Sequence, residues 1–523
     1  MPQTSTAAGS EFWTDDTLTD LLDRCVRDRG DRPAILSAGE VVDYRTLAER
    51  VDALAGGLVA LGIGRGDAVA VQLPNLPAFL YAILACARIG AVTSTIHMPY
   101  GPREAADAIR HADAKLVFAA AAAGDRQPAA ELAKLRPDLP SLAHVVAVGG
   151  PAPGGALAFD DVARPGVALP PPPAASDAYV MLFTSGTSSS PKAVLTDYRR
   201  FLANARLNCS EKQMGPGSIM MSAAPFTHLF GLYSFHLTLY GGGATALLPG
   251  FSPPGLVEAI RSFRPSHIFA APAHIASCLE AGLFDGETLA PVHYCVVSGA
   301  KAAPEFYRRA QEALGNGRIA QLWGMTECQC GMFTRPYEDI ERAAWGCGRP
   351  SPGNEARVCG ADGNPLPAGE DGELQIRGAS VFDGYHGNDE ANAASFAGDG
   401  WFRTGDRAVI DDTGAVSITG REKDLINRGG VKINPADVEE AIDRHPDIVQ
   451  SAIVPMPDPV LGERSCCFAI PRDGAAPRLA DLVAWLEGEG IAKLKWPERL
   501  ILVDEMPLTP TRKVIKGRLR IPD

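Results

Sequence analysis

Helix-like and strand-like stretches alternate over most of this chain, and this alternation limits the possible fold more than any other feature. The stretch YRTLAERVDALAGGLVALG has the apolar spacing of a helix, and DAVAVQLP that of a strand. PAFLYAILACARIG is helix-like up to Gly90, and AVTSTI is strand-like again. The same order returns at GLVEAIRSFRPSHIFAAP and at PEFYRRAQEALGNGRIAQLWG. Because such alternation is typical of parallel sheets covered by helices, we expect an α/β fold.

The character of the sequence changes near Cys347. The stretch EARVCGADGNPLPAGEDGELQIRG has short strand-like runs separated by turn residues, which indicates a β-rich part at about 347–420. Beyond it, helix-like PADVEEAIDRHP and RLADLVAWLEGEG flank strand-like SAIVPMP and CCFAIP. With 523 residues the chain can form several cores. We predict a large N-terminal domain of helix-covered, mainly parallel sheets over 1–420, and a small mobile α+β C-terminal domain over 421–523.

Composition narrows the functional classes. A net charge of −13 argues against nucleic-acid binding, which usually needs basic faces. Eleven cysteines without disulfide or zinc spacing suit a reducing compartment, and the N-terminus lacks a signal-peptide pattern. The uncharged run 213–257 is interrupted by proline, histidine and glycine, so it predicts a buried helix and strand rather than a membrane span. We therefore expect a cytoplasmic protein. We expect it to be a monomer or a homodimer.

The stretch LFTSGTSSSPKAV contains a run of small hydroxyl and glycine residues at 184–190, followed by Pro191 and Lys192. Such a backbone can turn its N–H groups and hydroxyls toward an anion, and a lysine adds charge. The stretch differs from a Walker loop, which ends in Gly-Lys-Ser or Gly-Lys-Thr. We expect it to cradle a triphosphate between the strand YVMLF and a following helix. A flexible Ser/Gly linker is the alternative.

Five stretches together resemble the adenylate-forming enzymes, the superfamily of acyl-CoA and aryl-CoA ligases. They are LFTSGTSSSPKAV, QLWGMTE, WFRTGDRA, GREKDLINRGGVKINPADVEEAI and PLTPTRKVIKGRLR, in the family's order from about residue 15 to the end. The resemblance implies that a carboxylic acid attacks ATP to give an acyl-adenylate and pyrophosphate. Coenzyme A then displaces AMP. ATP, Mg²⁺ and CoA are the implied cofactors and co-substrates.

The resemblance also implies a role for individual residues. Residues implied to hold the ATP phosphates are Thr184, Ser185, Gly186, Thr187, Ser188 and Lys192. Residues implied around the adenine and α-phosphate are Gly299, Ala300, Trp323, Gly324, Met325 and Thr326. Glu327 is implied to bind Mg²⁺, and Asp406 and Arg421 to bind the ribose. Lys513 is implied to act on the acid and the α-phosphate, with Lys516 as the alternative.

A domain rotation is also implied. Lys423 matches the family's hinge, and rotation there brings Gly429, Gly430 and Lys432 to the acceptor tunnel. Ser189, Ala193 and Arg512 stand where relatives have glycine, and we expect altered ATP affinity rather than lost chemistry.

The stretch PFTHLFGLYSF resembles the helix that walls the acyl pocket, with His228 at its mouth. The expected lining is Phe230, Tyr233, Ser234, Ser298, Leu322, Cys328 and Cys330. No charged residue is obvious in this set, so a medium acyl or aryl acid is favoured over an amino acid, whose ammonium would need a carboxylate. The chain has no carrier-protein motif, which favours an acid–CoA ligase. The alternatives are a stand-alone enzyme that loads a carrier protein or an amine, and a nucleotide-binding protein without turnover.

Overall fold

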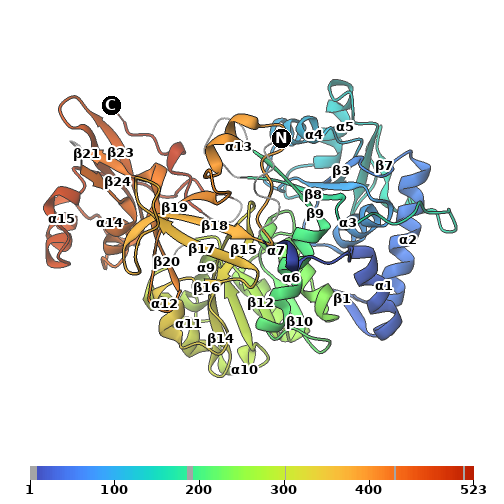
Figure 1. Ribbon diagram of the computed structural model, residues 1–523, viewed down its shortest axis with the longest axis horizontal. Coiled ribbons are helices and arrows are strands. Elements are labelled where there is room, and N and C mark those ends of the chain that lie inside the picture. Colours follow the sequence, from blue (N-terminus) through green and yellow to red (C-terminus); the bar gives the residue numbers. More distant parts are fainter. Residues whose placement is uncertain (1–8, 185–191, 301, 429–430, 510–512, 523) are drawn as a thin grey trace. The chain divides into compact units, whose positions relative to one another are not determined.

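The computed structural model describes residues 9–184, 192–300, 302–428, 431–509 and 513–522 (Figure 1). The chain forms two compact units, and each is described by itself. The first unit contains residues 1–355 and 376–402, and the second contains residues 356–375 and 403–523. The predicted functional boundary between residues 420 and 421 stays a prediction.

Two large sheets form the frame of the described part of the first unit. The seven-stranded sheet has the order β7 (Leu157–Ala158), β6 (His144–Val148), β5 (Leu116–Ala120), β3 (Ala68–Gln72), β4 (Val92–Thr95), β8 (Ala178–Phe183) and β9 (Ala193–Asp197). The nine-stranded sheet has the order β16 (Arg349–Pro350), β15 (Gln329–Phe333), β14 (Arg318–Met325), β13 (Tyr294–Val297), β12 (His267–Ala270), β10 (Ile219–Ser222), β11 (Ala244–Ala246), β1 (Pro33–Ser37) and β2 (Glu40–Asp43). Most neighbouring strands are parallel, with antiparallel pairs only toward the edges.

Helices cover both faces of these sheets. The layer packed between the sheets consists of α1 (Leu18–Arg29), α2 (Tyr44–Ala60), α3 (Pro77–Ile89), α6 (Tyr198–Glu211) and α7 (Leu229–Gly241). The outer face of the seven-stranded sheet carries α4 (Pro102–Ala112) and α5 (Pro128–Leu135). The outer face of the nine-stranded sheet carries α8 (Pro253–Phe263), α9 (Pro272–Glu280), α10 (Gly286–Leu289), α11 (Pro304–Leu314) and α12 (Ile340–Trp345). The predicted α/β fold is therefore confirmed.

The position of the phosphate loop differs from the prediction in one respect. The loop joins β8 to β9, two antiparallel strands that pair from Ala178–Asp197 to Phe183–Ala193, so a strand follows it rather than a helix. Helix α6 begins only at Tyr198, and the carboxylate of its N-cap residue Asp197 already accepts the N–H of Arg200 at 2.9 Å. Strand β9 therefore separates the loop from the N-terminus of α6.

The second unit is the α+β segment that the sequence predicts, together with most of the β-rich part. A four-stranded sheet has the order β17 (Asn354–Cys359), β18 (Asp371–Gly378), β19 (Phe402–Ile410) and β20 (Val416–Arg421). A five-stranded sheet contains β22 (Val431–Ile433), β21 (Ile426–Arg428), β24 (Gly462–Pro471), β23 (Ile448–Asp458) and β25 (Arg499–Leu502). Its core is closed by α14 (Pro435–Ile442) and α15 (Leu479–Gly488). Helix α13 (Asp389–Ser395) belongs to the first unit.

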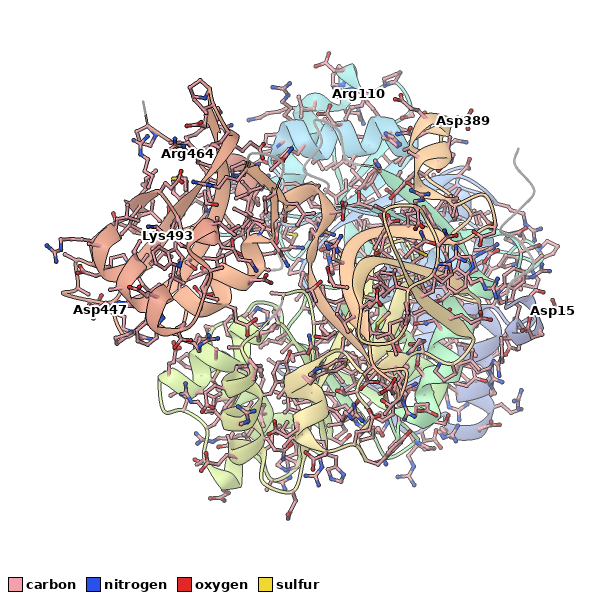
Figure 2. The ribbon with its side chains drawn as sticks, turned by 60° about the vertical axis from the view of Figure 1, so that its left-hand side comes forward. Asp15, Arg110, Asp389, Asp447, Arg464 and Lys493 are labelled. Atoms are coloured by element: carbon pink, nitrogen blue, oxygen red, sulfur yellow. The ribbon has the colours of Figure 1, made fainter. Side chains whose placement is uncertain are left out.

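Many charged side chains lie at the surface, and the cysteines lie in the core. Arg110, Asp389, Asp447 and Lys493 project from the surface (Figure 2). All eleven cysteines of the chain are free and buried, and burial raises the pKa of Cys86 to about 12. Helix α7 and strand β11 occupy the uncharged run 213–257, as predicted. None of the helices among the described residues is long and apolar enough to cross a membrane.

Candidate active site

The two ends of the phosphate loop meet at the carboxyl end of β8. The backbone N–H of Thr184 donates to the carbonyl of Lys192 at 2.9 Å, which closes the base of the loop. The ammonium of Lys192 lies 4.5 Å from the ring centroid of Tyr385, a cation–π contact that fixes its direction. Ser185, Gly186, Thr187 and Ser188 lie outside the described residues, as does Ser189.

The predicted metal ligand lies beside this loop end. Glu327 follows β14 and is only 5% exposed. Its Oε1 accepts the hydroxyl of Tyr385 at 2.8 Å, and its backbone carbonyl accepts the N–H of Phe382 at 2.8 Å. Burial, and then the charge of Glu327, raise the pKa of Tyr385 above its usual range, so this hydroxyl stays a donor. Tyr385 therefore connects Lys192 to Glu327.

Sequence reasoning missed Tyr385. It lies in the stretch FDGYHG, just outside the strands that carry the recognised motifs. Its segment pairs with the start of β9: Val194 bridges Tyr385, and the N–H of His386 donates to the carbonyl of Ala193 at 2.8 Å. In the sequence this residue is a single tyrosine in a glycine-rich stretch, which does not predict a role. The pairing with β9 shows that it lies beside the loop end. Ala193 is the first residue of β9 and has no positive φ, so the chain does not need a glycine there.

The predicted adenine residues occupy the end of β14 and the loop after β13. Trp323, Gly324 and Met325 are the last residues of β14, and Thr326 follows them. A Cβ on Gly331 of the neighbouring strand β15 would lie 2.5 Å from Cζ3 of Trp323, so glycine lets this strand press against the indole. Gly299 and Ala300 follow β13, and Gly299 has a φ of +98°, which favours glycine.

The predicted ribose and catalytic residues gather within the second unit. Asp406 of β19 is buried and pairs with Arg421 of β20 in the sheet. Its Oδ1 accepts a hydrogen bond from Nε of Arg421 at 2.6 Å. Although the Lys513 residue as a whole is exposed, desolvation of its ammonium, followed by the positive charge of Arg421, lowers its pKa to about 8. The negative charges of Asp406 and Asp424 raise the pKa of Lys513 and so oppose part of this decrease. These residues therefore form one electrostatic group.

Lys513 and Lys516 differ in their contacts. The ammonium of Lys516 forms an ion pair with Oε1 of Glu439 at 2.6 Å, and both side chains are less than a quarter exposed. Lys513 forms backbone hydrogen bonds with Thr509 and lies near Arg421. Lys516 thus holds the tail onto α14, whereas Lys513 faces the ribose residues. Lys423, the predicted hinge, lies in a 3-10 turn at Glu422–Asp424 and is exposed. Gly429 and Gly430 lie outside the described residues, and the backbone of Lys432 is in β22.

Four of the predicted acyl-pocket residues share one buried cluster between α7 and the nine-stranded sheet. They are Phe230, Tyr233, Leu322 and Cys330. Ser298 is buried directly after β13, and Cys328 is buried at the start of the β15 turn. Ser234 donates its hydroxyl to the carbonyl of Gly231 in its own helix at 2.6 Å, so it does not offer this group to a ligand.

His228 is the N-cap residue of α7. Its Nδ1 accepts the N–H of Phe230 at 3.3 Å, and burial lowers its pKa to about 4. Its ring centroid lies 5.8 Å from that of His97, whose pKa burial lowers to about 3. His228 is therefore neutral at physiological pH and acts as a hydrogen-bonding group rather than a cation.

We call the buried cluster that contains Phe230, Tyr233, Leu322 and Cys330 the acyl cluster. A lysine that the sequence analysis did not suggest also lies against it. Lys212 follows α6 directly, is completely buried, and burial lowers its pKa to about 7. Its ammonium lies 2.8 Å from the centroid of the Phe333 ring. The expected lining set contains no charged residue, but Lys212, which lies outside the motifs, reaches the cluster through the fold.

The first unit combines helix-covered parallel sheets with a small-residue loop whose ends meet beside a buried carboxylate, and the second unit contains a lysine near an Asp–Arg pair. Each of these features is typical of enzymes that handle nucleotide phosphates. Comparison with known families agrees. The AMP-binding enzyme model matches residues 22–386, and the AMP-binding enzyme C-terminal domain matches residues 437–513. The chain belongs to the AMP-binding enzyme family.

Relatives of known function and structure extend over almost the whole chain. A salicylyl-CoA synthase / salicylate adenylyltransferase of a Streptomyces species is 33% identical, covering 97% of this chain and 94% of the relative. A sulfoacetate–CoA ligase of Cupriavidus necator is 31% identical, covering 96% and 97%. The crystal structure of ATP-bound MatB from Rhodopseudomonas palustris is 27% identical, with a TM-score of 0.86, covering 96% and 98%. The predicted superfamily is confirmed.

Proposed function

We propose that this AMP-forming acid–CoA ligase activates a compact aryl or medium acyl acid with the residues described above. A carboxylate oxygen of the acid attacks the α-phosphorus of ATP, and the bond to pyrophosphate breaks. The sulfur of CoA then attacks the acyl carbon, the bond to AMP breaks, and the thiol proton is released. The observation that carries this proposal is the joining of Lys192, Tyr385 and Glu327 at the base of the phosphate loop.

Each group has a stated task in the first step. Lys192 neutralises charge on the ATP phosphates, and Thr326 donates to the α-phosphate. Asp406 accepts the ribose hydroxyls and is held in place by Arg421. Lys513 balances the negative charge that grows at the α-phosphate during attack. Fixed charges of this kind are the largest contribution to many enzymatic rates.

Glu327 is suited to hold Mg²⁺. This ion prefers one or two carboxylates together with substrate phosphates, and a single buried carboxylate that a tyrosine orients meets that need. When bound, Mg²⁺ would withdraw charge from the phosphates and so ease loss of pyrophosphate. Across the described ranges, no group of three or more His, Cys, Asp or Glu side chains is placed so that it could hold a metal ion by itself.

The acid and the acceptor are proposed on separate grounds. The aromatic walls Phe230 and Tyr233 suit a compact acyl or aryl body, and one relative acts on salicylate by name. CoA is the proposed acceptor, since named relatives are CoA ligases. We also propose action in the cytoplasm, as a monomer or homodimer, because eleven free thiols are typical of reducing compartments.

Two assays test this function. The first measures return of labelled pyrophosphate to ATP across a panel of aryl and acyl acids, with Glu327→Gln as the inactive reference. The second measures thioester formation with CoA and with carrier proteins, using the best acid. Exchange with thioester formation on CoA supports the proposal. Exchange with transfer only to a carrier protein would reassign the acceptor, and ATP binding without exchange would refute adenylation.

A further inference from the structure

A buried lysine without a counter-charge among the described residues lies against the acyl cluster. The ammonium of Lys212 forms no hydrogen bond and no ion pair within the described chain, and none of the residue is exposed. The face of the Phe333 ring lies against it, 2.8 Å from the nitrogen to the centroid. An aromatic face replaces only part of the water that an ammonium loses on burial.

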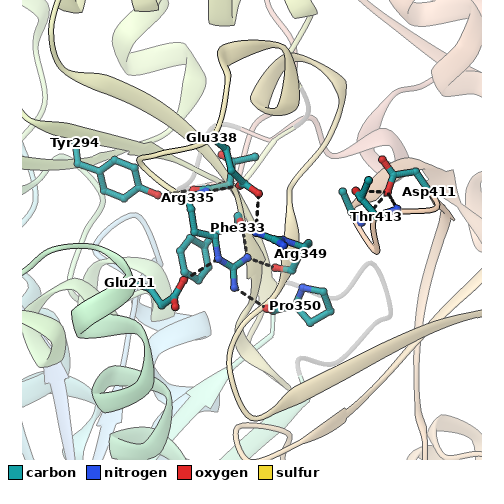
Figure 3. Close-up of polar contacts among 11 residues, drawn as sticks. Glu211, Tyr294, Phe333, Arg335, Glu338, Arg349, Pro350, Asp411 and Thr413 are labelled. Carbon is teal, nitrogen blue, oxygen red and sulfur yellow. Dashed lines mark hydrogen bonds and ion pairs between the residues drawn. The ribbon is translucent and has the colours of Figure 1, made fainter.

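The nearest carboxylate is already in use. Glu211 precedes Lys212, but its Oε2 accepts Nε of Arg335 at 3.0 Å (Figure 3). The remaining nitrogens of Arg335 donate to the carbonyls of Phe333, Arg349 and Pro350 at 2.7–2.9 Å. The Arg335 guanidinium also lies 4.3 Å from the centroid of the Phe333 ring. Two basic side chains therefore share this ring. Each nitrogen of Arg335 has an acceptor, whereas the nitrogen of Lys212 has none among the described residues.

Two further buried polar atoms of this region have no partner among the described residues at regular hydrogen-bond distance and angle. They are the hydroxyl of Tyr233 on α7 and the side-chain oxygen of Asn208 on α6, and both residues are at most 1% exposed. The Tyr233 hydroxyl lies next to the Cys330 thiol, a weak hydrogen-bonding group that also acts electrostatically on Lys212. Tyr233 and Lys212 thus share Cys330 as a neighbour.

The position of Tyr233 on α7 favours placing Lys212 at the end of the proposed acyl pocket that is remote from His228. Tyr233 is five residues beyond His228 on α7, which is roughly 7.5 Å along a helix axis. Tyr233, Cys330 and Phe333 belong to the same cluster as Phe230 and Leu322. A group that reached Lys212 would therefore belong to the end of the acid remote from the carboxylate that is activated.

We propose that Lys212, with the hydroxyl of Tyr233, receives a second anionic group of the acid substrate, a carboxylate or a sulfonate. This inference rests on the proposed function and specifies its substrate class. An anionic oxygen would supply the counter-charge that Lys212 lacks and accept the Tyr233 hydroxyl. Binding in this way would select acids that carry negative charge at both ends over acids of the same size with an apolar far end.

The test compares matched acids in the pyrophosphate exchange assay. Benzoate is paired with 4-carboxybenzoate and 4-sulfobenzoate, and hexanoate with adipate. In the wild-type enzyme we expect kcat/KM to favour the doubly charged member of at least one pair by tenfold or more, with most of the difference in KM for the acid. Lys212→Met should lower that ratio at least tenfold, and Tyr233→Phe should lower it several-fold. Exposed Lys134→Met is the matched control and should keep the ratio.

The outcomes separate this inference from adenylation itself. If the wild type uses the apolar members as well as the charged ones, the role of Lys212 is refuted while adenylation stands. An unchanged ratio in folded Lys212→Met refutes it equally. If Lys212→Met does not fold, the inference is tested by the wild-type ratio of kcat/KM values and by the change of that ratio in Tyr233→Phe. An unchanged ratio in Tyr233→Phe then refutes it. If no acid in any pair supports exchange, although the protein binds ATP, the proposed function and this inference both fail.

Discussion

Lys513 and Lys516 lie three residues apart in one basic tail, yet the structure gives them different environments. Lys516 is neutralised by Glu439, whereas Lys513 lies beside Arg421 and Asp406. We predict that Lys513→Ala lowers pyrophosphate exchange by about 10²–10³-fold, the usual cost of losing one group that stabilises transition-state charge. Lys516→Ala should keep exchange within a few-fold and cost about 1 kcal/mol of unfolding free energy, measured by denaturant titration. Equal losses of exchange in the two variants would contradict this assignment.

The lowered pKa of Lys513 predicts a pH dependence. Only the protonated ammonium can balance charge at the α-phosphate, so exchange should fall as pH rises through about 8. The groups that act on Lys513 are Arg421, Lys423, Asp406 and Asp424. In Lys513→Arg the side chain stays charged to far higher pH, so the alkaline fall should disappear even if the rate is lower. A fall at the same pH in both enzymes would assign it to another group.

Tyr385 offers a test of how Glu327 is oriented. Tyr385→Phe removes the hydroxyl that donates to Glu327 and keeps the ring that faces Lys192. We expect the Mg²⁺ concentration needed for half-maximal exchange to rise about tenfold, as is usual when a partner of a metal ligand is lost. Exchange measured over a Mg²⁺ titration at saturating ATP gives this value. Tyr385→Leu, which also removes the ring, should raise KM for ATP as well.

At the scale of single residues, the sequence leads to an assignment where residue type and motif coincide. Glu327, Asp406, Arg421 and Lys513 carry their assignments within recognisable stretches. Tyr385 and Lys212 do not, because each acquires a role only through a neighbour distant in the chain. The pairs Tyr385–Glu327 and Lys212–Phe333 are separated by 58 and 121 residues, and no local pattern encodes such contacts.

At the scale of elements, periodicity predicts which stretches are helices and strands, but not which of them meet. The stretch after the phosphate loop contains Val194 and Thr196, two β-branched residues typical of a strand, before the helix begins at Tyr198. The stretch is short and runs into the helix, so the sequence alone did not separate the two elements. The antiparallel pairing of β8 with β9 is a tertiary property.

The packing of β14 against β15 leads to another prediction. Gly331→Ala would place a methyl 2.5 Å from the Trp323 ring, so the ring must move. We expect KM for ATP to rise by about 3–10-fold through weaker stacking, and the unfolding free energy to fall by about 1–3 kcal/mol through overpacking. The control is Gly398→Ala, where the added methyl meets no atom within 4 Å. An unchanged KM for ATP in Gly331→Ala would argue against Trp323 as the adenine platform.

At the scale of the whole molecule, the proposed mechanism requires one chain to perform two reactions with two arrangements of its C-terminal part. If Lys423 is the hinge, a fixed φ there should obstruct the second arrangement more than the first. Lys423→Pro should then keep pyrophosphate exchange within a few-fold and lower thioester formation at least tenfold. Lys423→Ala removes the side chain but keeps backbone freedom, and should leave both rates similar to wild type. Equal losses in both reactions would place the hinge elsewhere.

The burial of every cysteine has a practical consequence for an enzyme that makes a mixed anhydride. An acyl-adenylate released into solution acylates accessible thiolates, and all eleven cysteines are buried while the protein is folded; burial also raises the pKa of Cys295 to about 12 and of Cys209 to about 11. The cysteines outside the expected acyl-pocket lining are therefore protected from the intermediate. For the same reason, a colorimetric thiol reagent added to a reaction should register the disappearance of CoA without a background from the protein. A slow later increase in that signal would report unfolding.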